Sequence, residues 1–188
     1  MIRNRKLPKR SFKGLCQSWY LGKAPLFQFA GKLWVVLIFL YVVSIAPIGK
    51  QLVSASAIEN AKLSAFILKG MGEGLQISGG TLFSTQYAIT VLPACTGFDF
   101  FLFWGALVVS FPARVGQKLL GLFMGITLLF VVNLFRIVGL YFIGVHFPGF
   151  FETAHVGFGG LPLILTSIFI SAIWIGWVKK GKNSDVTK

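Results

Sequence analysis

Four stretches of the sequence run for 14 to 23 residues without a charged side chain. They cover residues 33–49, 100–113, 119–135 and 156–178. The third continues to residue 145 once Arg136 is passed. A helix of about 20 apolar residues crosses the ~30 Å hydrocarbon core of a bilayer. With a mean hydropathy of +0.78, and 12% charged residues against roughly 25% in soluble domains, the chain is predicted to be a membrane protein.

These stretches predict an all-α polytopic membrane protein with four transmembrane helices and a small extracytoplasmic insertion. The spans are expected at about residues 33–49, 98–114, 119–145 and 156–178. The second extends beyond its uncharged stretch because Arg114 can snorkel to the headgroups. The expected organisation is a basic N-terminal arm at 1–32, one transmembrane domain at 33–178 with an outer insertion at 50–97, and a basic tail at 179–188.

Positive charge is distributed unevenly along the chain, which carries 18 Lys and Arg against 5 Asp and Glu and a formal net charge of +13. Eight basic residues precede the first predicted span, two lie between the second and third, and four follow the last. The insertion contains Lys50, Lys62 and Lys69. Because cytoplasmic loops are enriched in Lys and Arg, both termini are predicted to be cytoplasmic, next to an anionic inner leaflet. The same charges make nucleic-acid binding the less favoured interpretation, and no nucleic-acid partner is expected.

Residues 50–97 show a helical repeat followed by two short strand-like segments. The apolar and small positions of the repeat are Leu52, Ala55, Ile58, Ala61, Ala65 and Leu68, and the polar positions opposite them are Glu59, Asn60, Lys62 and Lys69. This pattern predicts an amphipathic helix on the outer leaflet, which ends in a glycine-rich segment. Residues 75–78 and 87–92 then predict a small β-hairpin around Gly79-Gly80.

Arg136 is the one charged residue within a predicted span. Counted from residue 119, it lies about 26 Å along the helix, near the outer boundary of the hydrocarbon. An ionisable residue in a span costs ~2.5–3.5 kcal/mol on insertion scales and indicates a functional position. Asn133 lies one turn earlier on the same face. The plainer interpretation of Arg136 is a snorkelling side chain that anchors the end of the helix.

Cys95 lies at the outer entrance of the second predicted span, between Pro93-Ala94 and Thr96-Gly97. At the start of a helix, the unpaired N–H groups and the positive end of the dipole favour a thiolate. A lone cysteine is more often an inert small apolar residue. The other cysteine, Cys16, lies in the basic arm on the opposite side, and the two fit neither a disulfide framework nor a zinc site.

His155 opens the fourth predicted span from the outside, with Glu152 one turn before it. His146 lies in the outer loop and is the rival candidate for a base. A thiol, an imidazole and a guanidinium on one side of the membrane supply a nucleophile, a proton shuttle and a stabiliser of oxyanion charge. Together they predict a thiol acyl-transfer site with no metal and no cofactor.

Two other functions compete with this one. The chain would be a non-enzymatic membrane scaffold if Arg136 paired with Asp99 or Glu152 across helices. Transport is less favoured, because four spans with a single intramembrane charge make a poor relay or pore.

Three short motifs resemble those of a known family. Ala94-Cys95-Thr96-Gly97, Asn133-Leu134-Phe135-Arg136 and the downstream His155 stand in the order and spacing of the exosortase/archaeosortase family, over roughly residues 75–178. That family comprises membrane cysteine transpeptidases or proteases that process a C-terminal sorting signal of exported proteins. The signal consists of a short motif, a transmembrane helix and a basic tail. Larger members have more spans, so this chain resembles a reduced, four-span form.

By this resemblance Cys95 is the nucleophile, Arg136 stabilises the thiolate and the oxyanion, and His155 is the general acid/base. The implied supporting residues are Thr96, Gly97, Asp99, Asn133 and Glu152. The resemblance implies a multi-pass protein of the cell membrane with its active site on the extracytoplasmic side. Its partners would be exported proteins with a sorting signal, and the acceptor would be water or an amine of a surface glycan or lipid.

Asp99 departs from the family pattern, in which many members have Arg or another non-acidic polar residue. A carboxylate about one turn from Cys95 disfavours the thiolate unless it pairs with Arg136 or orients His155. A different recognition motif in the substrate is the other explanation.

Overall fold

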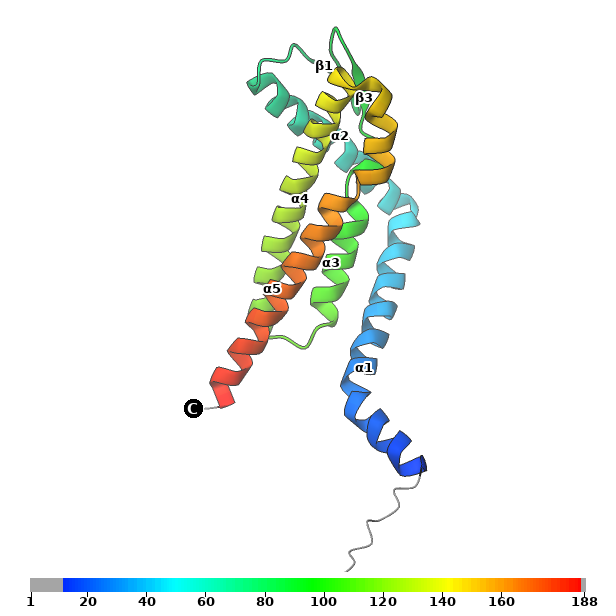
Figure 1. Cartoon of the computed structure of the whole chain (residues 1–188), viewed down its shortest axis with the longest axis vertical. Helices are drawn as coiled ribbons and strands as arrows, with labels where there is room; N and C mark the ends of the chain where they lie inside the picture. Colours follow the sequence, from blue (N-terminus) through cyan, green and yellow to red (C-terminus); the bar gives the residue numbers. More distant parts are fainter. Residues whose placement is uncertain (1–11, 187–188) are drawn as a thin grey trace, which may run out of the picture.

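The computed structural model describes residues 12–186 of the chain and is mostly helical (Figure 1). In chain order its elements are α1 (Phe12–Ile45), α2 (Pro47–Gly70), β1 (Gln76–Ser78), β2 (Thr81–Phe83), β3 (Ala88–Thr90), η1 (Pro93–Cys95), α3 (Phe98–Ser110), α4 (Val115–His146), η2 (Pro148–Phe150), η3 (Thr153–Phe158) and α5 (Leu161–Val186). Residues 1–11 of the predicted arm and residues 187–188 of the predicted tail lie outside the described part.

Helices α3, α4 and α5 form a bundle (Figure 1). Tryptophan rings pack against glycines where these helices meet. The rings of Trp104 on α3 and Trp174 on α5 meet edge to face, with centroids 5.9 Å apart. Their indole N–H groups donate to the carbonyls of Gly121 and Gln117 on α4, both at 3.1 Å. A Cβ at Gly121 or Gly125 would collide with these rings. Small residues on α4 therefore let three helices approach closely.

Helix α1 packs against α3, and the chain bends sharply between α1 and α2. Ala46 is extended (φ −64°, ψ 159°) because it precedes Pro47, which is the first residue of α2. The first span therefore ends at Ile45, and the predicted end at residue 49 is wrong. The predicted boundary between arm and span, at residues 32 and 33, falls inside the continuous helix α1.

Within the described residues, three segments are long and apolar enough to cross a bilayer, namely Pro25–Ile45, Val115–His146 and Pro148–Gly181. The second predicted span is the 13-residue α3, about 20 Å long, so four full-length spans are not confirmed. The helix stops at Ser110 rather than residue 114 because Pro112 favours the extended conformation that Phe111 adopts (ψ 137°).

Within the segment Pro148–Gly181, the long helix of the fourth predicted span begins later than residue 156. Residues Thr153–Phe158 form a separate π-helical turn, η3, and α5 begins at Leu161. Gly159 and Gly160 separate the two because glycine is a poor helix former, and Pro162 favours a new helix start.

The predicted helix of the insertion is present as α2, but its buried face differs from the prediction. The buried positions are Gly49, Ala57, Asn60, Ala61, Ser64, Ala65 and Leu68. Asn60, predicted on the polar face, is 1% exposed, whereas the predicted apolar residue Leu52 is 60% exposed. The reason is that α2 packs on α4 through its small residues, and this contact selects the face.

The predicted hairpin is a three-stranded antiparallel sheet in the order β1-β2-β3. Gly79 and Gly80 join β1 to β2, in the register Ser78↔Thr81, and the missed middle strand β2 then pairs with β3. Its three residues are too few to show a period of two in sequence. Leu82 and Ile89 pack beneath the sheet against α2 and α4.

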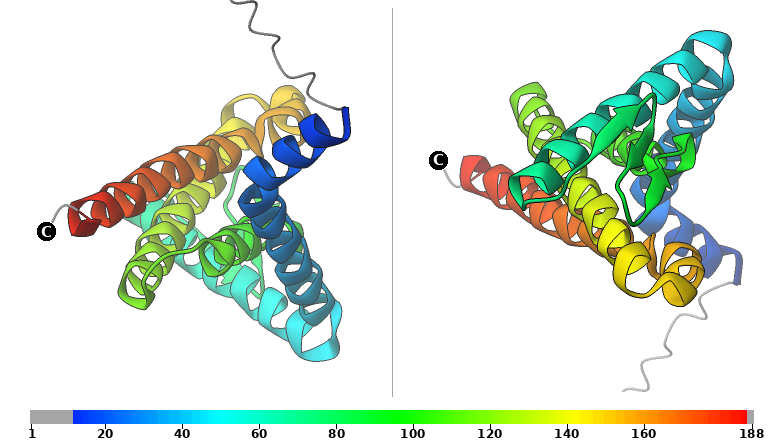
Figure 2. Two further views of the ribbon diagram at one scale, coloured as in Figure 1. Left: turned by 90° about the horizontal axis from the view of Figure 1, so that it is seen from below. Right: turned by 90° about the horizontal axis from the view of Figure 1, so that it is seen from above.

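The sheet lies at one end of the bundle, beside α2, as the view from above shows (Figure 2). The start of α1 and the end of α5 lie at the opposite end (Figure 1).

Candidate active site

Cys95 is the last residue of the short 3-10 helix η1, two residues before the N-cap of α3. Its N–H donates to the Leu92 carbonyl at 2.8 Å, and the Thr96 hydroxyl donates to the Pro93 carbonyl at 2.8 Å. Gly97 then turns the chain into α3 with φ +72°, a left-handed conformation that glycine adopts without strain. The Cys95 side chain is 7% exposed and lines a cavity.

His155 lies on η3, a π-helical turn of the kind that occurs often at functional sites. Its Nε2 is 3.9 Å from the Cys95 Sγ, within reach of a thiol contact that can tighten when substrate binds. The ring stacks on Phe151, with centroids 5.8 Å apart and planes within 3°. Its Nδ1 is buried and has no hydrogen-bond partner in the described residues.

His146, the rival base, is exposed at the end of α4 and stacks on Phe142, with centroids 6.2 Å apart. Of the two histidines, His155 is therefore the one placed against the thiol.

Arg136 and Asn133 reach the same segment from α4, one turn apart. The Arg136 Nη1 donates to the Cys95 carbonyl and to Asn133 Oδ1, both at 3.3 Å. The Asn133 Nδ2 lies 3.1 Å from the Cys95 carbonyl oxygen and 3.0 Å from that of Thr96. The two side chains thus hold the backbone carbonyls of Cys95 and Thr96. The guanidinium bonds the Cys95 backbone rather than its sulfur.

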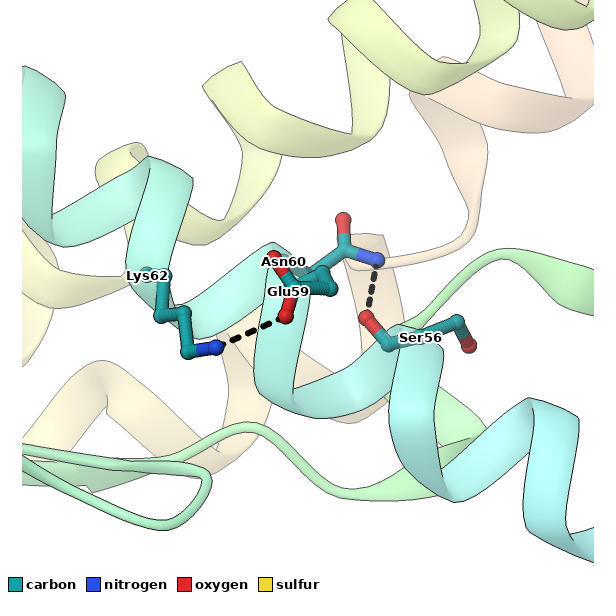
Figure 3. A network of polar contacts seen from close by, with 4 residues as sticks. All are labelled: Ser56, Glu59, Asn60 and Lys62. Carbon is teal, nitrogen blue, oxygen red and sulfur yellow. Dashed lines mark hydrogen bonds and ion pairs between the residues drawn. The ribbon is translucent and has the colours of Figure 1, made fainter.

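Asn60 on α2 also belongs to this network, although the sequence patterns did not indicate it. Its Nδ2 donates to the Ser56 carbonyl at 2.8 Å, which leaves Oδ1 to accept from Asn133 Nδ2 at 3.2 Å. Figure 3 shows this amide next to the Lys62–Glu59 ion pair of α2. The sequence signal that could have indicated Asn60 is its position in a row of small residues spaced four apart, Ser56, Asn60 and Ser64, which places all three on the same helix face.

Gly159 lets η3 approach α4. A Cβ there would collide with the His155 carbonyl and would lie 3.1 Å from Arg136 Nη2. This glycine therefore lets the turn that carries His155 lie close to the Arg136 guanidinium.

The two carboxylates of the predicted site stand apart from it. Asp99 and Glu152 are exposed, and within residues 12–186 neither bonds to Arg136 or His155. The interhelical ion pair of the scaffold hypothesis is therefore not formed. Nor do the described residues contain three or more His, Cys, Asp or Glu side chains placed to hold a metal.

A cavity of about 250 Å³ opens onto the sulfur of Cys95. It is bounded by β3 and its neighbours at residues 87–92, by Ile137 and Leu140 of α4, and by Phe151 and His155. The walls are mostly apolar, and the thiol and imidazole stand together on one side. Such a space can take a short peptide segment and exclude bulk water from it.

A sequence model of the transmembrane exosortase family matches residues 14–173, a range that includes every residue of this site. No curated protein and no solved structure matches the chain.

Proposed function

The chain belongs to the transmembrane exosortase family, and from this premise we propose that it is a membrane cysteine peptidase or transpeptidase that processes C-terminal sorting signals of exported proteins. One observation carries the proposal: Cys95 Sγ and His155 Nε2 lie 3.9 Å apart on the wall of one cavity. A nucleophile within reach of a base is the signature of covalent catalysis.

In the proposed reaction, His155 Nε2 takes the proton of the Cys95 thiol, and the thiolate attacks the scissile carbonyl carbon. The tetrahedral intermediate collapses to a thioester at Cys95, and the leaving amine takes its proton from His155. Water or an amine of a surface glycan or lipid then gives a proton to His155 and attacks the thioester. The tetrahedral intermediate formed by this attack collapses, which releases the acyl product and restores the Cys95 thiol with the proton held by His155.

Arg136 and Asn133 have two parts in this proposal. They bind the carbonyls of the nucleophile segment and so preorganise the thiol. The guanidinium has no anionic partner in the described residues, which leaves its charge to stabilise the thiolate and the developing oxyanion. We expect the site to face the outside of the cell membrane, where the signal of an exported protein is held by its own helix in the same bilayer.

We expect Cys95→Ala to abolish processing, because no other group in the cavity can form the thioester. The measurement is accumulation of uncleaved precursor in cells that produce an exported protein ending in a short motif, one transmembrane helix and a basic tail. Cys16→Ala is the matched control, and we expect it to keep full activity because Cys16 belongs to the first part of α1, which the charge pattern predicts on the cytoplasmic side. Full processing by Cys95→Ala protein, inserted at normal levels, would exclude the covalent mechanism.

A further inference from the structure

Strand β3 is an edge strand, because the sheet runs in the order β1-β2-β3. One backbone hydrogen bond lies just beyond each end of β3. The Val91 N–H donates to the Gly80 carbonyl at 2.8 Å, and the Ser84 N–H donates to the Tyr87 carbonyl at 2.9 Å. In an antiparallel pair, residues that exchange such bonds alternate with residues that do not.

This alternation determines which backbone groups of β3 are unpaired. Ile89 lies between the two flanking bonds and is opposite Leu82, so it is the residue that bonds to β2. Ala88 and Thr90 therefore direct their N–H and C=O groups away from β2, toward the free edge. Their side chains are exposed, while that of Ile89 is buried beneath the sheet.

The free edge of β3 borders the cavity that contains the nucleophile. Residues 87–92 line this cavity together with Cys95 and His155. A row of unpaired backbone donors and acceptors, an apolar wall and a thiol thus meet in one space of about 250 Å³. An extended peptide satisfies such an edge, because strand addition supplies main-chain hydrogen bonds in register.

We propose that the substrate binds by strand addition: an extended segment of the sorting signal pairs with the free edge of β3 and brings its scissile carbonyl to Cys95. This inference rests on the proposed function and specifies how the substrate is held. The backbone bonds of Ala88 and Thr90 align the segment, and the apolar wall formed by Leu140 and Phe151 receives its side chains.

The first test is Ala88→Pro in the full-length protein in membranes. Proline removes the outward N–H of an edge position without removing a bond to β2. We expect the apparent KM for a substrate peptide to rise about threefold to tenfold, because one hydrogen bond to the substrate is lost. The change in kcat should be smaller. A KM equal to that of the wild type would overturn the inference.

The matched control is Ile77→Pro. Because Leu82 of β2 bonds toward β3, Ile77 of β1 directs its backbone groups to the other free edge of the sheet, and it does not line the cavity. We expect its KM to equal that of the wild type. Equal increases in both variants would mean that a proline anywhere in the sheet weakens binding, and would contradict docking at β3.

A second test uses the unaltered protein, so that it does not depend on how a variant folds. One amide at a time in the substrate peptide is replaced by an ester, which removes a single N–H. Pairing with β3 predicts that KM rises about threefold or more at alternate residues near the cleavage site and stays constant between them. If KM changed equally at every substituted position, as expected for a peptide held by its side chains alone, strand addition would be overturned.

The two proposals fail in different ways. Cleavage that depends on Cys95 but ignores Ala88→Pro and shows no alternation would refute strand addition and leave the peptidase intact. Cleavage that survives Cys95→Ala would refute the covalent function itself.

Discussion

At the scale of single residues, Asn133 joins more parts of the site than any catalytic candidate does. It is fully buried, donates toward the Cys95 and Thr96 carbonyls and toward Asn60, and accepts from Arg136. A buried polar group left without partners costs roughly 1–3 kcal/mol, so this side chain has a strong preference for one arrangement. The segment that carries Cys95 is thereby held against α4.

The two histidines lie in different surroundings, and only His155 is placed against the Cys95 thiol. We expect His155→Ala to slow processing about 100-fold to 10,000-fold, the usual contribution of a positioned acid or base. His146→Ala keeps near wild-type activity, because its ring stacks on Phe142 at the exposed end of α4. Rates of precursor cleavage by the two purified variants make the comparison. The assignment of His155 as the base is wrong if His146→Ala causes the larger loss.

At the scale of elements, α4 is the helix on which the other parts assemble. Its N-terminal half receives Trp104 of α3 and Trp174 of α5 at glycines, and near its C-terminal end Gly144 lies against the ring of Tyr87. Between them, Asn133 and Arg136 hold the segment that carries Cys95. The spacing of small residues along this one helix therefore sets the distances within the site.

Gly125→Ala tests this dependence on α4. The added methyl group collides with the Trp104 indole, so we expect a loss of about 1–3 kcal/mol of unfolding free energy. Gly139→Ala on the same helix is the control. A Cβ there meets nothing within 4 Å, and the higher helix propensity of alanine makes it neutral or about 0.5–1 kcal/mol stabilising. Thermal unfolding in detergent measures both, and equal shifts would contradict the packing argument.

At the scale of the whole molecule, the described residues form two apolar cores. One joins α2 and the sheet to the C-terminal half of α4 and includes Cys95. The other lies between α3, α4 and α5. The start of α1 and the end of α5 lie at the far end from the sheet (Figure 1). The bundle thus presents a site at one end and basic segments toward the other.

This polarity predicts the orientation in the membrane. Positive charge favours the cytoplasmic side, so the sheet is expected outside and Cys16 inside. In a Ser78→Cys, Cys95→Ala protein, an impermeant thiol reagent added to intact cells should label the exposed turn at position 78. Cys16 should react only after the cells are permeabilised. Labelling of Cys16 first would reverse the orientation and place the site in the cytoplasm.

The sequence by itself determined the features that depend on local composition. Charge-free stretches identified a membrane protein, and they located α4 because residues 119–145 carry no charged side chain other than Arg136. Helical spacing put Asn133 and Arg136 on one face. The sequence misplaced helix ends where a proline or paired glycines act, as at Pro47, Pro112 and Gly159-Gly160.

Only the tertiary structure decided what lies against what. Cys95 and His155 are 60 residues apart in sequence, and their 3.9 Å contact depends on how η3 packs on α4. Asn60 is polar by type but buried by its place on α2, and β2 is a strand because β1 and β3 flank it. Such outcomes follow from packing between distant segments, which no periodicity within one segment records.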